Sequence, residues 1–394
     1  MSATEIVICN PVRTAIGTYN GSLKAIPATE LGGVVIAETL WRSGLPGDKV
    51  DTVIMGNVIQ AGGRMNPARQ AAIGGNLPVS VPALTVNRVC GSGAQAIASA
   101  AQEVLLGFAD VAIAGGMENM DQAPYLVPNG RWGNRMGDSI MYDSMLRDGL
   151  NDAFSGQHSG WHTEDLVTNV GLSRLDQDEW AARSQQRFSQ AQAAGRFSSQ
   201  IVGVNVKVGR ETKVFDKDES NRPETTVETL GKLKAAFRSD GTITAGNAPG
   251  LNSGAAAMIV ANRAKAEHLG LEPVARLISF GVGAVEPGLF GLGPVPAIQQ
   301  ALARAGWSIG DVDRFEINEA FAAVPLALIR KLGINPELVN VDGGAIAHGH
   351  PIGASGAILT VRLVHSLLAD GLRRGIVTLC IGGGQGIALA LEVL

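Results

Sequence analysis

The 394-residue sequence has only three cysteines, Cys9, Cys90 and Cys380, and they lie far apart with no CxxC pair. This usage fits neither a disulfide framework nor a thiolate zinc site, and it predicts a reducing compartment. No apolar run approaches the roughly 18 residues that a membrane-spanning helix needs. With a formal net charge of −4, the chain also lacks the positive excess typical of nucleic-acid binders. We therefore expect a globular protein that binds neither membranes nor nucleic acid.

Neither end of the sequence shows a recognisable targeting signal. The start, MSATEIVICNPVRTAIG, has no basic stretch followed by an apolar segment, and the end, ALALEVL, has no Ser-Lys-Leu type signal. We therefore predict a cytoplasmic protein. Glycine, by contrast, is abundant at 51 residues.

An internal repeat organises the sequence. Three segments of the first half recur in the same order in the second half, at a slowly drifting spacing. The matching pairs are residues 37–51 with 299–313, 91–94 with 354–357, and 113–116 with 380–383. Three matches in the same order indicate a duplicated domain.

Each copy predicts the same succession of elements. An amphipathic helix is followed by a short apolar strand, a glycine-rich turn, a helix of small residues and a second strand. The predicted strands are 52–55, 111–114, 314–317 and 376–381, and the predicted small-residue helices are 92–106 and 355–368. Alternating strands and helices predict a mainly parallel sheet covered on both faces. Two such halves would form an α/β body layered α-β-α-β-α.

A polar, irregular segment at 121–248 has no copy elsewhere, and we interpret it as an insertion that covers a site. This interpretation divides the chain into four parts. They are an N-terminal half at 1–120, the inserted loop domain at 121–248, the completion of the N-terminal half at 249–270, and a C-terminal half at 271–394.

The cysteines are the first candidates for chemistry. Cys90 lies between an apolar strand and a Gly-Ser-Gly turn that opens a helix, in TVNRVCGSGA. Helix N-terminal N–H groups favour a thiolate and offer an oxyanion site, although a cysteine that merely fills a small space fits this pattern equally well. Cys380, in TLCIGGGQG, is explained more readily by packing when taken alone. The duplication would bring both turns to one cleft, which suggests one nucleophile and one acid/base group.

The histidines and one asparagine are less decisive. His348 and His350 form an HxH pair in GGAIAHGHPIGASGA, but no acidic or cysteine ligand stands near them, so a base near a thiol is favoured over a metal site. Their spacing does not decide which of the two acts. Asn318, in NEAFA, is explained by helix capping. The remaining histidines are expected at surface or structural positions: His158, His162, His268 and His365.

No dinucleotide-binding GxGxxG turn, P-loop, EF-hand or HExxH motif occurs, which disfavours a nicotinamide enzyme. Five motifs in order instead resemble the thiolase family, in particular its biosynthetic acetyl-CoA acetyltransferases. They are VNRVCGSG, GGMENM, NEAFA, GGAIAHGHPIGASG and CIGGGQG, and the likeness covers essentially the whole chain.

The resemblance implies a duplicated thiolase-like fold and a Claisen condensation. Two acetyl-CoA would give acetoacetyl-CoA and coenzyme A, or the reverse, by a ping-pong mechanism through an acyl-cysteine. Coenzyme A would be a substrate or product, with no metal or redox cofactor. The resemblance also implies a homotetramer or a homodimer.

The family's roles carry over to residues of this sequence. Cys90 would be the nucleophile, activated by His350, and Cys380 would move the proton of the α-carbon. His350 and a water held by Asn318 would stabilise the enolate, while the N–H groups of Cys90 and Gly382 would hold the acyl-enzyme oxygen. Coenzyme A and acyl contacts are implied for Leu150, His158, Ser159, Arg222, Phe237, Phe290 and Phe321.

Several positions depart from the family pattern. Pro249 replaces a usual serine at the coenzyme A site, Ser159 and Phe290 replace methionines of the acyl pocket, and His348 replaces an aliphatic residue. Two alternatives therefore stay open. One is a degradative 3-ketoacyl-CoA thiolase for longer or branched chains, and the other is a catalytically silent acyl-CoA-binding module.

Overall fold

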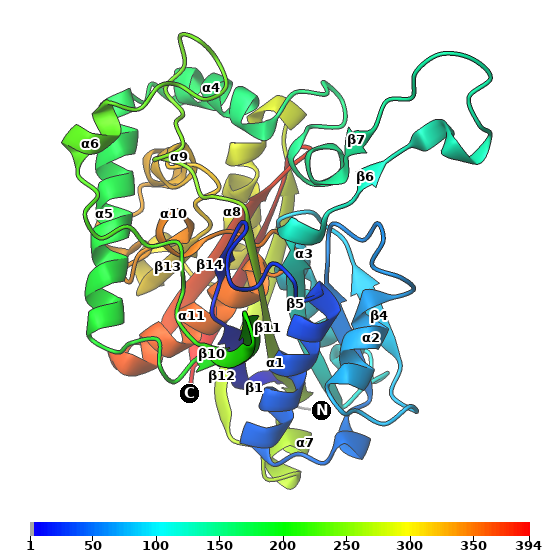
Figure 1. The fold of residues 1–394 in the computed structure, drawn as a ribbon. Helices are drawn as coiled ribbons and strands as arrows, with labels where there is room; N and C mark the ends of the chain where they lie inside the picture. Colours follow the sequence, from blue (N-terminus) through cyan, green and yellow to red (C-terminus); the bar gives the residue numbers. More distant parts are fainter. Residues whose placement is uncertain (1–3) are drawn as a thin grey trace.

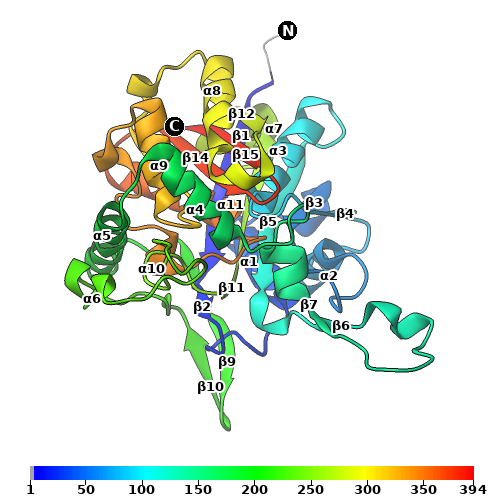
Figure 2. The same cartoon turned by 90° about the horizontal axis from the view of Figure 1, so that it is seen from above.

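The computed structural model describes residues 4–394 (Figures 1 and 2). Its main sheet has the strand order β13-β14-β15-β12-β1-β11-β5-β3-β4, and the two halves join where β1 pairs with β12. The strands are β1 (Ile6–Thr14), β3 (Thr52–Gly56), β4 (Ala83–Val86), β5 (Val111–Asn119), β11 (Asn252–Asn262), β12 (Pro273–Ala284), β13 (Arg314–Ile317), β14 (Arg374–Ile381) and β15 (Gln385–Val393). Outward from the β1–β12 junction, both halves show two antiparallel pairings followed by a parallel one, which confirms the duplication. The N-terminal half has β4 as an additional edge strand.

The expectation of a mainly parallel sheet is wrong. Along this strand order, β4, β3 and β5 in one half and β13 and β14 in the other pair in parallel, while the remaining neighbours are antiparallel. The short strand at 201–202 adds one more parallel pair, with β1. The glycines after Cys380 give the physical reason. Gly383 and Gly384 have φ of 84° and 85°, and this tight turn returns the chain directly into β15. A short hairpin of this kind can join only antiparallel strands.

The layers themselves follow the prediction. Helices α1 (Ala28–Ser43) and α2 (Pro67–Gly74) cover the outer face of the N-terminal half of the sheet. Helices α8 (Pro294–Ala305) and α9 (Ala323–Leu332) cover the outer face of the C-terminal half. Between the halves lie α3 (Ser92–Leu105) and α11 (Ser355–Ala369), packed in one core with strands of both (Figure 1).

Small residues allow the two central helices to touch. A Cβ added at Gly93 of α3 would lie 2.6 Å from the backbone nitrogen of Ala357 in α11. The predicted small-residue helices at 92–106 and 355–368 are thus confirmed, and their composition has a packing reason. Because the helices meet backbone to backbone, their N-terminal turns, next to Cys90 and His350, are brought together.

The segment between the two halves contributes the cover over this point. It contains α4 (Ser159–Val170), α5 (Arg174–Ala193), α6 (Val227–Gly231), the hairpin β9 (Val204–Val208) and β10 (Glu211–Phe215), and an arm whose base is the short pair β6 (Tyr125–Leu126) and β7 (Tyr142–Asp143). The arm extends away from the body in both views (Figures 1 and 2). The remaining strands and α-helices are β2 (Gly17–Thr18), β8 (Ile201–Val202), α7 (Arg263–His268) and α10 (Ala345–His348). Within residues 4–394, no helix combines the length and apolar character needed to cross a bilayer.

Candidate active site

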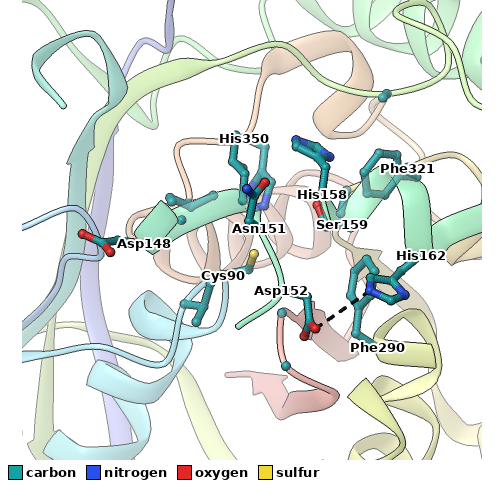
Figure 3. A pocket seen from close by; sticks show the side chains of 18 of the residues that line it. Cys90, Asp148, Asn151, Asp152, His158, Ser159, His162, Phe290, Phe321 and His350 are labelled. Carbon is teal, nitrogen blue, oxygen red and sulfur yellow. Dashed lines mark ion pairs between the residues drawn. The ribbon is translucent and has the colours of Figure 1, made fainter. Parts of the chain in front are cut away.

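A cavity of about 370 Å³ opens beside the N-terminus of α3 (Figure 3). The sequence-predicted residues that line it are Cys90, Leu150, His158, Ser159, Phe237, Phe290, Phe321, His350 and Gly382. Asn318 and Cys380 are 1% exposed and lie behind this wall, and Arg222 lines a neighbouring cavity instead. The structure therefore brings together residues from both halves and from the intervening segment.

Cys90 stands on strained backbone. The preceding residue, Val89, has φ of 45°, a left-handed conformation that a β-branched side chain rarely adopts. Hydrogen bonds from Ser92 hold this turn, with its N–H and its hydroxyl both donating to the Val89 carbonyl. Strain that the surrounding structure maintains is typical of functional turns, and here it projects the thiol into the cavity.

The thiol of Cys90 is neutral in the resting protein. Burial raises its pKa to about 11, and the nearby Glu118 carboxylate raises it further, although the N–H groups of Gly382 and Cys90 itself act in the opposite direction. The N–H groups favour ionisation, as the sequence indicates, but desolvation outweighs them in the resting protein. The same two N–H groups converge at the sulfur, as an oxyanion site on the acyl-enzyme would require.

His350 is held in a defined tautomer. Its Nδ1 lies 2.6 Å from the Ser355 hydroxyl, which donates its own proton to the Pro351 carbonyl at 2.8 Å. Since the hydroxyl has one proton, Nδ1–H must be the donor to Ser355 Oγ. Nε2 is then unprotonated, and Asn318 Nδ2 donates to it at 3.2 Å. Burial lowers the pKa of His350 to about 4, so the ring is a neutral base at physiological pH.

Cys380 and Asn318 complete the buried side of the site. Burial raises the pKa of Cys380 well above its usual value and the adjacent Cys90 raises it further, so Cys380 is also a neutral thiol at rest. Asn318 keeps its Oδ1 without a protein partner among the described residues, although this atom is buried. An unsatisfied buried carbonyl oxygen is suited to hold a water or a polar atom of a ligand.

A row of rings forms the wall opposite Cys90. His158 stacks on Phe237 with ring centroids 4.6 Å apart, and Phe237 and Phe290 each contact Phe321 edge-to-face. His158 Nδ1 accepts the N–H of Gly160 and caps α4, which leaves its Nε2–H to donate towards the cavity. Gly160 has no space for a side chain, because an added Cβ would overlap the Phe237 ring.

Two polar residues of the wall were missed by the sequence analysis. His162 was expected at a surface or structural position, but it is 8% exposed and lines the cavity with Asp152, from which it is separated by 3.9 Å (Figure 3). Ser155 joins them, since its Oγ lies 2.9 Å from Asp152 Oδ2 and 2.7 Å from His162 Nε2. Helix spacing could have indicated that His162 faces the cavity, because it lies four residues after His158 and therefore on the same face of α4.

Arg222 and Pro249 mark the border with a second cavity of about 610 Å³. Arg222 is exposed on its wall, and its N–H donates to Gln185 Oε1. Pro249 belongs to segment 248–251, which lines both cavities. The proline thus stands between the site around Cys90 and the region of Arg222.

The first histidine of the HxH pair is not part of the cavity wall. His348 is 2% exposed and packs beside Phe188, and both its ring nitrogens lack partners among the described residues. Its pKa is well below the usual value, because it is buried and lies near Arg362 and Arg13. Of the two histidines that sequence spacing left open, only His350 faces Cys90.

Comparison with known proteins agrees with this arrangement. The family described as "Thiolase, N-terminal domain" matches residues 6–264, and "Thiolase, C-terminal domain" matches 271–393. The chain belongs to the thiolase family. The predicted fold and the predicted acyltransferase class are thereby confirmed.

Individual thiolases are similar over nearly their full length. An acetyl-CoA acetyltransferase of Pseudomonas aeruginosa is 50% identical over 98% of this chain and 99% of its own. A probable acetyl-CoA acyltransferase of Staphylococcus epidermidis is also 50% identical, over 99% of both chains. The crystal structure of the Bacillus anthracis acetyl-CoA acetyltransferase superposes with a TM-score of 0.97 at 42% identity, covering 100% of this chain and 99% of that one.

Proposed function

We propose that this thiolase is an acetyl-CoA C-acetyltransferase that interconverts two acetyl-CoA with acetoacetyl-CoA and coenzyme A. The observation that supports this best is the placement of Cys90 and His350 on the wall of one cavity, with Asn318 and Cys380 buried behind it. The tautomer of His350 leaves its Nε2 without a proton. A silent binding module would not need a base so arranged. The names of the relatives, acetyl-CoA acetyltransferases among them, point to the same activity.

In the thiolytic direction, Cys90 passes its proton to His350 Nε2 and its sulfur attacks the ketone carbon of acetoacetyl-CoA. The bond between the ketone carbon and the α-carbon breaks, and the electron pair becomes the enolate of acetyl-CoA. Asn318 and His350 would stabilise this enolate, and Cys380, a neutral thiol at rest, supplies the proton to its α-carbon.

The second half-reaction releases the acetyl group. The thiol of coenzyme A loses its proton to the site and attacks the acetyl carbonyl on Cys90, which leaves as a thiolate. The proton from coenzyme A and the proton that His350 took from Cys90 together restore the two thiols, Cys90 and Cys380. The N–H groups of Cys90 and Gly382 would hold the carbonyl oxygen during both transfers. Condensation uses the same steps in reverse order.

We further propose that the insertion at 121–248 covers coenzyme A. His158 and Phe237 would contact the pantetheine arm, Leu150 and Phe321 the acyl group, and Arg222 the phosphate of the adenosine. Support comes from the continuity of the two cavities through segment 248–251. Neither step calls on a metal, and no group of three or more potential metal ligands occurs among residues 4–394.

A broader 3-ketoacyl-CoA thiolase is the second candidate. Ser159 is short for a pocket wall, and Phe290 shapes the same wall at 5% exposure. These residues bear directly on acyl length, and one group of relatives carries the wider name acyltransferase. The deciding experiment compares initial rates of coenzyme-A-dependent cleavage of acetoacetyl-CoA and of a six-carbon 3-ketoacyl-CoA at equal concentration. Preference for the four-carbon substrate supports the first candidate, and preference for the longer chain supports the second.

Self-association to a homodimer or homotetramer is also proposed. The arm carries large apolar side chains that its own hairpin does not bury, with Trp132 81% and Met136 91% exposed. Apolar surface of this extent is typical of a protein interface. Light scattering of the intact protein and of a Trp132→Ser, Met136→Ser variant tests this, and an unchanged mass would overturn the role of the arm.

A further inference from the structure

A fully buried carboxylate lies close to Cys90 without any role in the proton transfers above. Glu118, in β5, is 0% exposed and accepts four close hydrogen bonds. Asn57 Nδ2 donates at 2.9 Å and the Val58 N–H at 3.0 Å, while the Ile59 N–H donates at 3.3 Å. The fourth donor is the N–H of Gly353, at 2.9 Å.

These donors belong to the two segments that flank the reacting pair. Val58 and Ile59 follow β3 of the N-terminal half and pack in one apolar cluster with Val89 and Cys90. Gly353 belongs to the C-terminal half and lies three residues after His350. A single carboxylate therefore joins the support of the nucleophile to the segment of the base.

The atoms around Glu118 and Gly353 are closely packed. A Cβ added at Gly353 would lie 2.6 Å from Glu118 Oε2 and 2.9 Å from the Cα of Asn57. The glycine is needed so that the two halves can approach the carboxylate, and the carboxylate in turn satisfies N–H groups that would otherwise be buried without a partner.

We propose that Glu118 is a positioning residue of this thiolase, which holds the Cys90 turn and the His350 segment at the separation that acyl transfer requires. The inference rests on the proposed function, since it takes Cys90 and His350 as the reacting pair. Glutamine would not replace it, because one of its terminal atoms donates protons and would face an N–H group of the protein. One of the two segments must then move away.

The charge of Glu118 adds a second, separable effect. Its carboxylate is one cause of the raised pKa of Cys90, whereas burial raises its own pKa to about 7. Removal of the charge makes Cys90 easier to ionise, even as the geometry for transfer to the acyl group deteriorates. Ionisation of the thiol and turnover then change in opposite directions. Because loosening of the fold would also expose the thiol and lower its pKa, a variant that keeps the charge at position 118 is needed to separate the two causes.

The test compares the wild type with Glu118→Gln and Glu118→Asp. We expect kcat for acetoacetyl-CoA thiolysis to fall at least about tenfold in Glu118→Gln with KM changed less than about threefold, because the loss concerns the reacting geometry. The midpoint of Cys90 alkylation by iodoacetamide, followed on the Cys90 peptide by mass spectrometry, moves to lower pH. Glu118→Asp keeps the negative charge, so the alkylation midpoint should return to the wild-type value. Its kcat should recover only in part, because the shorter aspartate side chain cannot reach all the hydrogen-bond donors.

Glu164→Gln is the matched control. Glu164 is another buried carboxylate, and it accepts hydrogen bonds from the N–H groups of Thr242 and Ile243 and from the Thr242 hydroxyl. Its loss should lower the melting temperature without moving the alkylation midpoint. The proposal is overturned if Glu118→Gln keeps kcat within about twofold of wild type or keeps the wild-type midpoint. If Glu118→Gln does not fold, a Glu118→Asp variant with wild-type kcat overturns it equally. A Cys90→Ala variant that still turns over would instead refute the proposed function, whatever Glu118 does.

Discussion

Replacement of Ser355 by alanine should impair turnover without touching any reacting atom. Ser355 Oγ is the acceptor that requires a proton on His350 Nδ1, and it stands 2.6 Å from that nitrogen. In the alanine variant, the buried Nδ1–H loses its partner and the ring can adopt the other tautomer, with its proton on Nε2. That tautomer cannot accept the proton of Cys90.

The size of the effect follows from the cost of an unsatisfied buried donor, about 1–3 kcal/mol. At 1.36 kcal/mol for each factor of ten, kcat/KM for acetoacetyl-CoA thiolysis should fall about 5- to 150-fold. The assay is the initial rate across a range of acetoacetyl-CoA concentrations at saturating coenzyme A. Thermal unfolding of the same sample separates lost stability from lost catalysis.

Thr360→Val provides the matched control for this variant. Thr360 lies on the same helix, is fully buried, and its hydroxyl donates to the Gly356 carbonyl at 2.8 Å just as Ser355 donates to Pro351. Its loss should lower stability and leave kcat/KM close to wild type. If Ser355→Ala keeps kcat/KM within about twofold of wild type, the hydroxyl does not set the tautomer and the reasoning fails.

Three further predictions follow from the site and its supports. Because the pKa of Cys90 is raised to about 11, its thiol stays protonated through neutral pH, so the rate of its alkylation by iodoacetamide without substrate should still rise above pH 9; a plateau below pH 8 would contradict this. Ser159→Met lengthens a side chain of the cavity wall and should raise the ratio of four-carbon to six-carbon 3-ketoacyl-CoA cleavage, whereas an unchanged ratio would remove Ser159 from the acyl pocket. Gly356→Ala places a methyl group against Ala94 of α3, with Cβ atoms 2.8 Å apart, and should lower the unfolding free energy by about 1–3 kcal/mol in chemical denaturation; an equally stable variant would show that the two helices can separate at no cost.

Much of the fold was predictable because the chain repeats itself. Strands β3, β5, β13 and β14 and the small-residue helices α3 and α11 followed from periodicity and glycine placement. Strands β1, β11, β12 and β15, which form the middle of the sheet, were not predicted. The strand directions could not be predicted in this way. They depend on whether two strands are joined by a tight turn, which makes them antiparallel, or through a helix, which allows them to be parallel. The sequence does not show that Gly383 and Gly384 adopt positive φ and form a tight turn.

The site, too, could be predicted only in part from the sequence. Motif resemblance found Cys90, His350 and Cys380, and the structure brings them to one place. The protonation state of Cys90 could not be predicted, since the sequence shows the helix N-terminus that favours a thiolate but not the burial that opposes it. Glu118 was hidden for a similar reason, because its partners come from segments almost 300 residues apart in the sequence, joined only by the fold.

The central claim is that Cys90 carries the acyl group between the two half-reactions. The most direct measurement is the mass of peptides from protein that has been mixed with acetoacetyl-CoA in the absence of free coenzyme A and then quenched in acid. We predict one acetyl group on the peptide that contains Cys90, none in a Cys90→Ala variant, and its removal when coenzyme A is added before the quench. An acetyl group on Cys380, or no acetylated peptide from a protein that turns over, would contradict this account.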